Sequence, residues 1–474
     1  MEGLEISEVF LSVVKKESYS YRWDSTYFLK EFIFSPLENT QTDLIENLFN
    51  IKSGSTPRDR DAELKEGVIL LKTNDIRNNV LKDKGDSFFY IDTYTNSRMK
   101  ATQLKPNDVL INIVGATTDV IGRVSFVSDS FPKANITQAM SLMRAKQQSV
   151  LPHYLFCFLL SKYGNMQVRR FARPTGQYNM NHSELGCFEI PLLSIDFQNE
   201  LTRLISNNNQ LDIKSKQVYN QAENLLLETL GLENFQPSKE PVNVKTFSDS
   251  FGSSGRLDAE YYQVKYDNLE EAIIKYSNYS TIGNIRTDNF RGLQPEYVED
   301  GELDVINSKH ILENTLDYGN FEKTSIAYWE SQKRARVFKG DILTYTTGAN
   351  IGRTQVYLIE NKALASNHVN ILRLKEGYNS FYVGFVMNSI IGRMQTEKFS
   401  AGSAQAELYP KDIDQFIIPF CSDANQSKIM EQIEESFKLK RQSEHLLEVA
   451  KTAVEMAIEQ DEETAIAFIN DNMN

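Results

Sequence analysis

The sequence has little of what a catalytic or metal centre needs. It holds three cysteines, five histidines and two tryptophans among 474 residues. The cysteines Cys157, Cys187 and Cys421 have no CxxC spacing and are odd in number, which argues against a disulfide framework. The histidines are scattered without the spacing of metal ligands.

Catalytic sequence motifs are also missing. The chain has no GxxxxGK[ST] or GxGxxG segment to cradle a phosphate, and no HExxH or GxSxG segment. No Pro-Pro pair occurs, so the [DNS]PP[YFW] motif of amino-methyltransferases is absent. We therefore expect a non-enzymatic chain with no catalytic residue, no metal site and no cofactor of its own.

Long apolar runs are absent as well. The longest, Leu155–Leu160 and Phe381–Met387, are too short to span a bilayer. The first residues include Glu2, Glu5 and Glu8, where a secretory signal would carry an apolar segment. We expect a cytoplasmic protein.

Negative charge dominates the whole chain but is unevenly distributed. The formal net charge is -13. Residues 51–190 nevertheless hold 19 Lys and Arg against 13 Asp and Glu, and residues 281–420 hold 15 against 17. The acidic excess therefore lies outside these two segments. Because binding to DNA depends on local positive patches, the acidic total does not exclude it.

The chain repeats itself at an offset of about 230 residues. Gly54-x-x-Pro57 recurs as Gly292-x-x-Pro295, and Arg22-x-Asp24 recurs as Arg256-x-Asp258. In the later part of each copy the offset is constant at 228, with ten identities over 45 residues, among them Tyr154/Tyr382, Gln167/Gln395 and Pro191/Pro419. A repeat of this length is a whole domain and not a solenoid unit.

Each copy reads as short strands followed by helices. In the first copy, β-like runs lie at Gly67–Leu71, Phe88–Ile91, Val109–Ile113, Gly122–Val127 and Met140–Met143. A helix is predicted over Tyr154–Arg169 and a closing strand over Phe188–Ile190. After each copy, apolar or small residues follow heptad spacing over four heptads, which predicts a long helix packed on a partner helix.

The pattern predicts an α+β chain with two similar mixed α/β recognition domains, separated by two long antiparallel coiled-coil helices in a pseudo-two-fold repeat. Taken alone, each heptad-spaced stripe of apolar or small residues could instead belong to a helix that packs only on its own domain. The predicted segments are an N-terminal extension (1–50), a first recognition domain (51–192), a central helix (193–234), a connector (235–280), a second recognition domain (281–420) and a C-terminal helix (421–474).

The predicted interface between the helices has equivalent residues in both. Asn208 and Ser436 are polar positions at the same place in the two stripes, as are Ser215 and Ser443. A helix over residues 201–229 would span about 43 Å, comparable to the ~34 Å between successive groove faces of DNA. The apolar interface residues are expected to be Leu201, Leu204, Leu211, Val218, Leu225, Ile429, Leu439, Leu446 and Ala453.

In this order of elements the chain resembles the specificity subunit of type I restriction–modification systems. Each domain ends in a hydrophobic-Pro exit, followed by Gln198 or Gln426 at the helix start. Three stretches resemble recurring family segments: Gly54-Ser55-Thr56-Pro57, Gly176-Gln177-Tyr178-Asn179-Met180 and Lys339-Gly340-Asp341-Ile342-Leu343. The second copy departs from the family at Ala404-Gln405-Ala406-Glu407-Leu408, which lacks a clean Gly-Gln-x-Asn.

The resemblance implies that two domains read the two halves of a bipartite site in double-stranded DNA. It also implies that the helices carry two copies of a methyltransferase (modification) subunit, and restriction subunits in some complexes. S-adenosylmethionine, ATP and Mg would then belong to those partners.

Base edges and phosphates are read by cationic and amide side chains. Solvated surface charge is the alternative for each of the following residues. The candidate DNA contacts are Arg58, Arg60, Lys72, Asn74, Arg77, Arg169, Arg170, Arg173 and Gln177 in the first domain, and Arg291, Lys309, Lys333, Arg334, Arg336 and Asn350 in the second. Arg123 and Arg353 stay open, and Arg22 and Arg256 are expected to form structural ion pairs with Asp24 and Asp258.

Three other functions compete with this one. The first is a scaffold of two protein-binding domains without nucleic acid, which salt-dependent DNA binding would discriminate. The second is a DNA reader of another methylation-based defence system. The third is a methyltransferase or nuclease with an unrecognised site, which binding of S-adenosylmethionine by the isolated chain would support.

Overall fold

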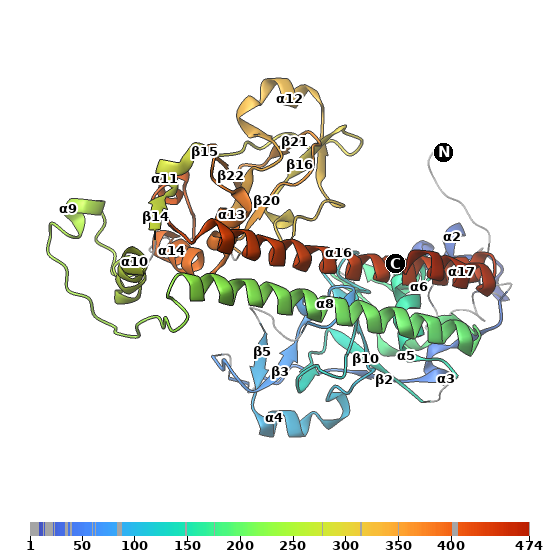
Figure 1. The fold of residues 1–474 in the computed structure, drawn as a ribbon. Helices are drawn as coiled ribbons and strands as arrows, with labels where there is room; N and C mark the ends of the chain where they lie inside the picture. Colours follow the sequence, from blue (N-terminus) through green and yellow to red (C-terminus); the bar gives the residue numbers. More distant parts are fainter. Residues whose placement is uncertain are drawn as a thin grey trace. The chain divides into compact units, whose positions relative to one another are not determined.

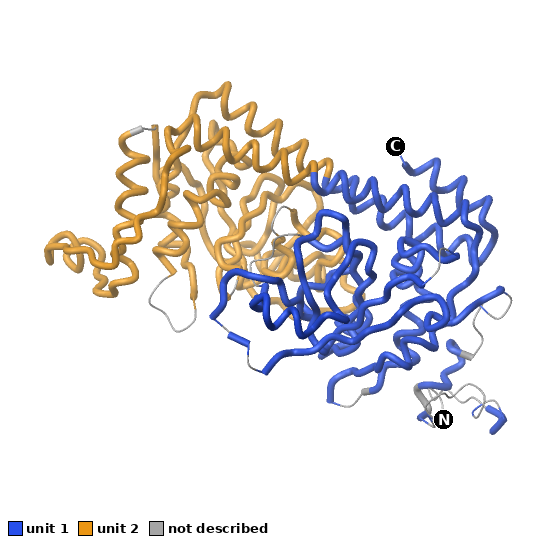
Figure 2. The backbone as a smooth tube through the Cα atoms, turned by 90° about the horizontal axis from the view of Figure 1, so that it is seen from below, with its two compact units in different colours: residues 1–213, 440–474 blue, residues 214–439 orange. Residues whose placement is uncertain are grey.

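A computed structural model describes residues 9–12, 14, 22, 24–33, 37, 40–58, 60–61, 63–82, 88–146, 149–174, 176–276, 278–312, 315–348, 350–400 and 406–473. Two compact units divide the chain: unit 1 is Met1–Ile213 with Lys440–Asn474, and unit 2 is Lys214–Leu439 (Figure 2). Much of the predicted N-terminal extension lies outside the described residues. None of the helices in the described part of the chain is both long and apolar enough to cross a membrane.

Unit 1 contains a five-stranded sheet of order β2-β10-β6-β8-β4 and a three-stranded sheet of order β5-β3-β9. Strands β3 and β6 are buried along their whole length, so each reads as an unbroken apolar run or nearly so. The strands are β1 (Thr42–Leu44), β2 (Phe49–Ser53), β3 (Val68–Leu71), β4 (Asn79–Val80), β5 (Phe89–Ile91), β6 (Val109–Asn112), β7 (Val114–Gly115), β8 (Val124–Phe126), β9 (Ala134–Ile136), β10 (Met140–Ala145), β11 (Arg173–Pro174), β12 (Tyr178–Asn179) and β13 (Glu189–Pro191).

Helices of unit 1 pack on these sheets. Helix α5 is buried almost all round and contacts β6 and β8, which explains its uniformly apolar sequence. The helices are α2 (Lys30–Ile33), α3 (Ile45–Leu48), α4 (Thr93–Arg98), α5 (Pro152–Leu160), α6 (Lys162–Phe171) and α7 (His182–Gly186), with 3-10 turns at Ser25–Phe28, Thr73–Asp75 and Lys100–Thr102.

Unit 2 repeats this arrangement with its own strands. Its sheets have the orders β15-β22-β19-β20 and β17-β16-β21-β18, and β16 runs parallel to β21 as β3 runs parallel to β9. The strands are β14 (Asn278–Thr281), β15 (Arg286–Arg291), β16 (Leu303–Ile306), β17 (Glu322–Thr324), β18 (Arg336–Val337), β19 (Ile342–Tyr345), β20 (Thr354–Val356), β21 (Ala363–Ala365), β22 (Val369–Leu374) and β23 (Ile417–Phe420).

The shorter helices of unit 2 occupy places that match those of unit 1. Helices α13 and α14 follow β22 as α5 and α6 follow β10. The helices are α9 (Phe251–Ser254), α10 (Val264–Tyr276), α11 (Ile282–Ile285), α12 (Ala327–Ser331), α13 (Ser380–Asn388), α14 (Ile390–Ser400) and α15 (Pro410–Ile413), with 3-10 turns at Ser308–His310 and Lys333–Ala335.

Equivalent residues make equivalent hydrogen bonds in the two units. The Tyr154 hydroxyl donates to the carbonyl of Pro191 at 2.8 Å, and the Tyr382 hydroxyl donates to the carbonyl of Pro419 at 2.9 Å. The Gln167 amide pairs in both directions with the backbone of Glu189, and Gln395 does the same with Ile417. The predicted duplication of a mixed α/β domain is therefore confirmed.

Two long helices continue from these domains, α8 (Ile195–Thr229) and α16 (Asp423–Glu459) (Figure 1). They pair within each unit. In unit 1, Asn208 Nδ2 donates to the carbonyl of Ser443 at 2.6 Å and to its hydroxyl at 2.9 Å. In unit 2, Ser215 and Ser436 each donate a hydroxyl to the other's carbonyl at 2.8 Å. The polar positions of the two predicted stripes therefore face each other.

Replacement of Asn208 by alanine tests this polar pairing. We expect a loss of about 1 to 2 kcal/mol in the free energy of unfolding, because two buried hydrogen bonds disappear. Denaturant unfolding measures the loss. Asn199→Ala is the matched control, because Asn199 is an exposed residue of the same helix, and an equal effect of both variants would contradict a role of Asn208 in the pairing.

The apolar interface residues differ in burial along α8. Leu201, Leu204, Ile429, Leu439, Leu446 and Ala453 are buried, whereas Leu211, Val218 and Leu225 are only partly buried. Towards its end, α8 instead buries Ala222 and Leu226 in the core of unit 2, and Leu230 directly after the helix joins them. A straight helix with 3.6 residues per turn drifts away from a strict heptad stripe, which accounts for the shift.

Two predicted single helices are each divided. The helix predicted over Tyr154–Arg169 breaks at Ser161, whose hydroxyl donates to the carbonyl of Phe158 and accepts from the amide of Gly164. The C-terminal segment folds as α16 and a separate α17 (Glu462–Asn472), because Asp461 caps the start of α17. Both breaks follow local capping by a side-chain oxygen, a signal that hydrophobic periodicity does not contain.

Candidate nucleic-acid interface

Three loops of unit 1 are held together beside its five-stranded sheet. Strand β12 pairs with β7, which places the loop tip at Gln177 beside the loop 116–123. The fully buried Asn112 donates to the carbonyl of Val120 at 3.1 Å and to that of Thr73 at 3.0 Å. We call residues 72–78, 116–123 and 176–177 the loop cluster of unit 1.

Cations collect on this loop cluster. Arg77 is exposed, and Arg123 is partly buried with its Nε donating to the carbonyl of Asp119 at 2.6 Å. Burial lowers the pKa of Arg123, and the nearby positive charge of Arg77 lowers it further. Two like charges held close together favour an anion between or beside them, such as a phosphate.

A second cationic group lies on the ring of Phe89. The guanidinium of Arg60 lies 4.2 Å from the ring centroid, and the ammonium of Lys72 lies 3.9 Å from it. Lys72 is also the first residue of the 72–78 turn. The structure therefore brings together Arg60, Lys72, Asn74 and Arg77 of the predicted contacts, while Arg58 is an exposed residue of the preceding loop.

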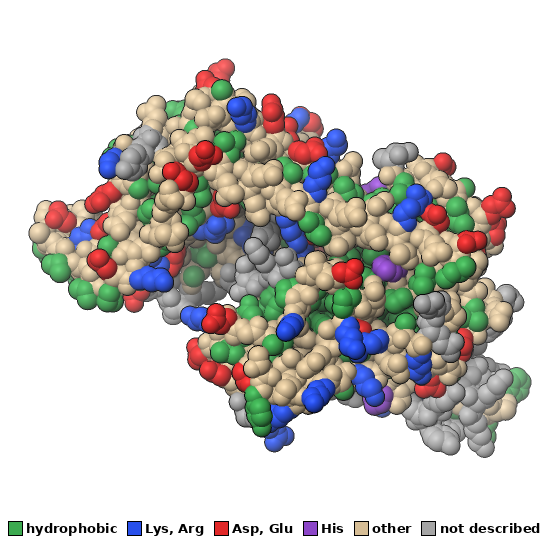
Figure 3. Space-filling view, turned by 60° about the horizontal axis from the view of Figure 1, so that its bottom comes forward, with side chains coloured by type: hydrophobic (Ala, Val, Ile, Leu, Met, Phe, Trp, Pro, Cys, Tyr) green, Lys and Arg blue, Asp and Glu red, His purple; other side chains and the backbone are tan. Residues whose placement is uncertain are grey.

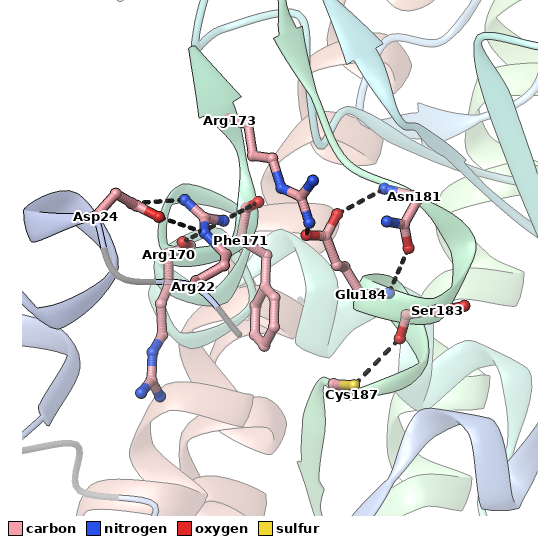
Figure 4. A network of polar contacts seen from close by, with 9 residues as sticks. All are labelled: Arg22, Asp24, Arg170, Phe171, Arg173, Asn181, Ser183, Glu184 and Cys187. Atoms are coloured by element: carbon pink, nitrogen blue, oxygen red, sulfur yellow. Dashed lines mark hydrogen bonds and ion pairs between the residues drawn. The ribbon is translucent and has the colours of Figure 1, made fainter. Parts of the chain in front are cut away.

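The arginines at and just after the end of α6 make separate contacts, and Figure 4 shows those of Arg170 and Arg173. Arg173 forms an ion pair with the buried Glu184, and Arg169 forms one with Glu31 at 2.8 Å. The guanidinium of Arg170 lies 4.6 Å from the ring centroid of Tyr27. These contacts stabilise the fold locally, so the charges of Arg169 and Arg173 are already partnered in the free protein.

Arg22 also contacts the end of α6. It forms a bidentate pair with Asp24, at 2.7 and 2.8 Å, and donates to the carbonyl of Phe171 at 2.7 Å (Figure 4). In unit 2, Arg256 pairs with Asp258 and donates to the carbonyl of Phe399 at 3.3 Å. The expected structural ion pairs of the repeated Arg-x-Asp element are confirmed.

Three of the predicted contacts of unit 2 form ion pairs with carboxylates. Arg291 pairs with Glu407, Lys309 with Glu322, and Arg336 with Glu330. Lys333 and Arg334 are exposed, with Arg334 near the ring of Phe290, and Asn350 is partly buried. DNA contact by each of these six residues stays a prediction. The segment that corresponds to the Gln177 loop, residues 401–405, lies outside the described residues.

Sequence reasoning missed Asn112, which ties two of the loops together. A signal for it exists, since Asn112 is the one polar residue in the run Val109–Ile113. A buried amide in an apolar strand needs hydrogen-bond partners, and here those partners are loop carbonyls.

One face of the molecule carries side chains of both charges. On the face drawn in Figure 3, Lys and Arg side chains alternate with Asp and Glu. Within the described residues, no group of three or more His, Cys, Asp and Glu side chains could hold a metal ion. Any binding of DNA must therefore rely on local arrangements such as the loop cluster.

Residues 282–449 match the protein family described as the type I restriction modification DNA specificity domain. No curated protein sequence matches the chain. Among solved structures, the chain is similar to the type I restriction-modification S subunit from M. genitalium, with 13% identity, a TM-score of 0.36, and coverage of 91% of this chain and 96% of that one.

A further similar structure is the HsdS subunit from Thermoanaerobacter tengcongensis, with 13% identity, a TM-score of 0.28, and coverage of 89% of this chain and 97% of that one. The family match covers most of unit 2, and unit 1 shares its strand arrangement and its buried hydrogen bonds. Residues 282–449 are thus similar to the type I restriction modification DNA specificity domain.

Proposed function

We propose that this chain is a sequence-specific DNA-binding subunit that reads a bipartite site in double-stranded DNA, one half with each unit. The observation that carries the proposal is a DNA specificity domain whose fold and buried hydrogen bonds occur twice in one chain. Because the two copies differ in their surface side chains, they would read different half-sites. The paired helices would set the distance between the half-sites.

The proposal assigns chemistry to partner subunits and none to this chain. Two copies of a methyltransferase subunit would supply S-adenosylmethionine-dependent methylation, and restriction subunits, where present, would use ATP and Mg. This chain would then select the DNA site and hold its partners there. The competing function is a scaffold that binds only proteins, and it predicts that the chain does not bind duplex DNA.

Replacement of Arg77 and Arg123 by glutamine tests DNA binding by the loop cluster. We expect the affinity for duplex DNA to fall about tenfold or more, because two phosphate contacts are lost. The slope of log affinity against log salt should become less steep by about 2. Fluorescence anisotropy with the full chain and a labelled duplex measures both quantities.

The matched control removes two cations from the long helices of the same unit. Arg203 and Lys451 pair with Glu200 and Glu448 and are substantially exposed. R203Q/K451Q should leave the salt slope unchanged. Wild-type protein that binds no duplex at any salt concentration would refute the proposed function and favour the protein scaffold.

Methylation mapping tests the role in the complex. Single-molecule sequencing of host DNA, with and without this chain, should show methylated adenines at a two-part sequence only when the chain is present. The distance between the halves would also be read directly. Unchanged methylation would contradict a specificity role.

A further inference from the structure

A short turn follows strand β3 of unit 1, and hydrogen bonds hold the backbone of this turn in place. The carboxylate of Asp75 accepts a hydrogen bond from the amide of Lys72 at 2.8 Å, and the amide of Asp75 donates to the carbonyl of Lys72 at 2.8 Å. Asn112 binds the carbonyl of Thr73 from below. The turn Lys72–Asp75 is therefore closed by its own hydrogen bonds and is tied to the side-chain amide nitrogen of the buried Asn112.

Unit 2 has the same turn after the corresponding strand β16. The imidazole of His310 accepts from the amide of Asn307 at 2.9 Å, and the amide of His310 donates to the carbonyl of Asn307 at 3.0 Å. His310 is buried, and its ring lies 5.4 Å from that of Phe321. A histidine thus performs in unit 2 the capping that Asp75 performs in unit 1.

The side chain in the middle of the turn differs between the units and is exposed in both. It is Asn74 in unit 1 and Lys309 in unit 2. Lys309 pairs with Glu322, but 62% of its side chain is exposed, so water or DNA can replace this pair at small cost. Neither side chain is needed for the capping of its own turn.

Such a turn suits the reading of a base edge. The fixed backbone removes most of the entropy cost of ordering the contact, and the side chain alone supplies the chemistry. An asparagine amide presents one donor and one acceptor, which match N7 and N6 of adenine. A lysine ammonium presents only donors, which match O6 and N7 of guanine.

We propose that positions 74 and 309 determine base specificity, with Asn74 selecting adenine in one half-site and Lys309 selecting guanine in the other. This inference rests on the proposed function, because it assigns the reading residue within each DNA-binding unit. The neighbouring cations Arg77 and Arg123 would hold the phosphate backbone and add affinity without base preference.

Exchange of the two side chains tests the inference. The wild-type chain, N74K and K309N are each used to select binding sequences from a pool of duplexes with randomised sequence. We expect N74K to change one position from adenine to guanine in a single half-site, with about a tenfold change in preference. K309N should change one position from guanine to adenine in the other half-site.

A matched control and the wild-type result separate the possible failures. Asn199→Lys adds the same charge to an exposed position of α8 and should leave both half-sites unchanged. If the wild-type chain selects no sequence, the proposed function fails. The wild-type chain could instead select a bipartite sequence that is unchanged in N74K and K309N, or that both variants bind with uniformly lower affinity. Either result overturns this inference alone.

Discussion

Replacement of Gly292 by alanine is expected to destabilise unit 2 by about 3 kcal/mol or more. A Cβ atom at this position would lie 2.0 Å from the carbonyl oxygen of Ala365 and 2.6 Å from that of Ser366. Both atoms belong to the backbone, so no side chain can move aside to accept the methyl group. The strand ends must separate instead, and overpacking of this kind is among the most destabilising single changes.

The backbone around Gly292 shows what would be lost. The amide of Gly292 donates to the carbonyl of Val369 at 2.9 Å, and the amide of Leu293 donates to that of Ala365 at 3.1 Å. These bonds join the chain after β15 to the last residue of β21 and the first residue of β22. A shift large enough to admit the methyl group would break at least one of them.

Denaturant unfolding combined with hydrogen exchange measures this effect within unit 2. In G292A, the amides of β21 and β22 should exchange faster than in the wild type. Gly319→Ala is the matched control, because no atom lies within 4 Å of a Cβ built there and Gly319 does not have a positive φ. Near-wild-type stability of G292A would show that this backbone approach is not tight in solution.

The repeat could be predicted from the sequence because its buried contacts use the same residues in both copies. Tyr154 and Tyr382 make the same bond because each residue and its acceptor, Pro191 or Pro419, stand at one constant offset. Gly54 and Gly292 are likewise both closed in by backbone carbonyls. Residues that are identical in the two copies at a fixed offset therefore mark positions where packing requires the same residue.

The strand orders could not be predicted in the same way. Strand β2 pairs with β10, and β3 runs parallel to β9, across long stretches of intervening chain. Short apolar runs indicate that a strand exists but not which strand it joins, because pairing depends on the packing of the whole sheet. The sequence also did not predict β11 and β12, which have two residues each.

The candidate site was only partly predictable for a similar reason. A sequence shows which residues are cations but not which carboxylates lie beside them. Arg291 pairs with Glu407, and Arg169 pairs with Glu31, across more than a hundred residues in each case. The grouping of Arg60 and Lys72 on Phe89 also depends on the folded sheet.

Replacement of Arg373 by methionine should cost about 3 kcal/mol at neutral pH. Arg373 forms a bidentate pair with Asp341, at 2.8 and 3.0 Å, and only 4% of the Asp341 side chain is exposed. Methionine keeps much of the apolar stem but leaves the buried carboxylate without its counter-charge, which is far more costly than loss of a surface pair.

The cost should shrink as the pH falls. Burial raises the pKa of Asp341 above its ordinary value, while the hydrogen bond from Arg373 opposes that rise. Loss of Arg373 therefore raises the pKa further. At pH values between the pKa of Asp341 in the unfolded chain and its higher pKa in the folded chain, the folded chain binds a proton that the unfolded chain lacks. Stability therefore falls as the pH rises through this window. R373M should widen this pH window. At its acid end Asp341 is protonated and carries no unpaired charge, so the substitution should cost less there.

Two further variants distinguish a buried charge from lost packing. R373M/D341N should recover most of the stability, because the amide carries no charge. Lys339→Met is the control for loss of a nearby cation, since Lys339 and Glu360 form an exposed pair at 3.0 Å and should contribute no more than about 0.5 kcal/mol. A loss in R373M that is independent of pH and not restored by D341N would mean that Arg373 acts through packing. Unit 1 has the same pair in Arg144 and Asp108, so each copy of the domain fixes the same strands with one buried charge and one covering arginine.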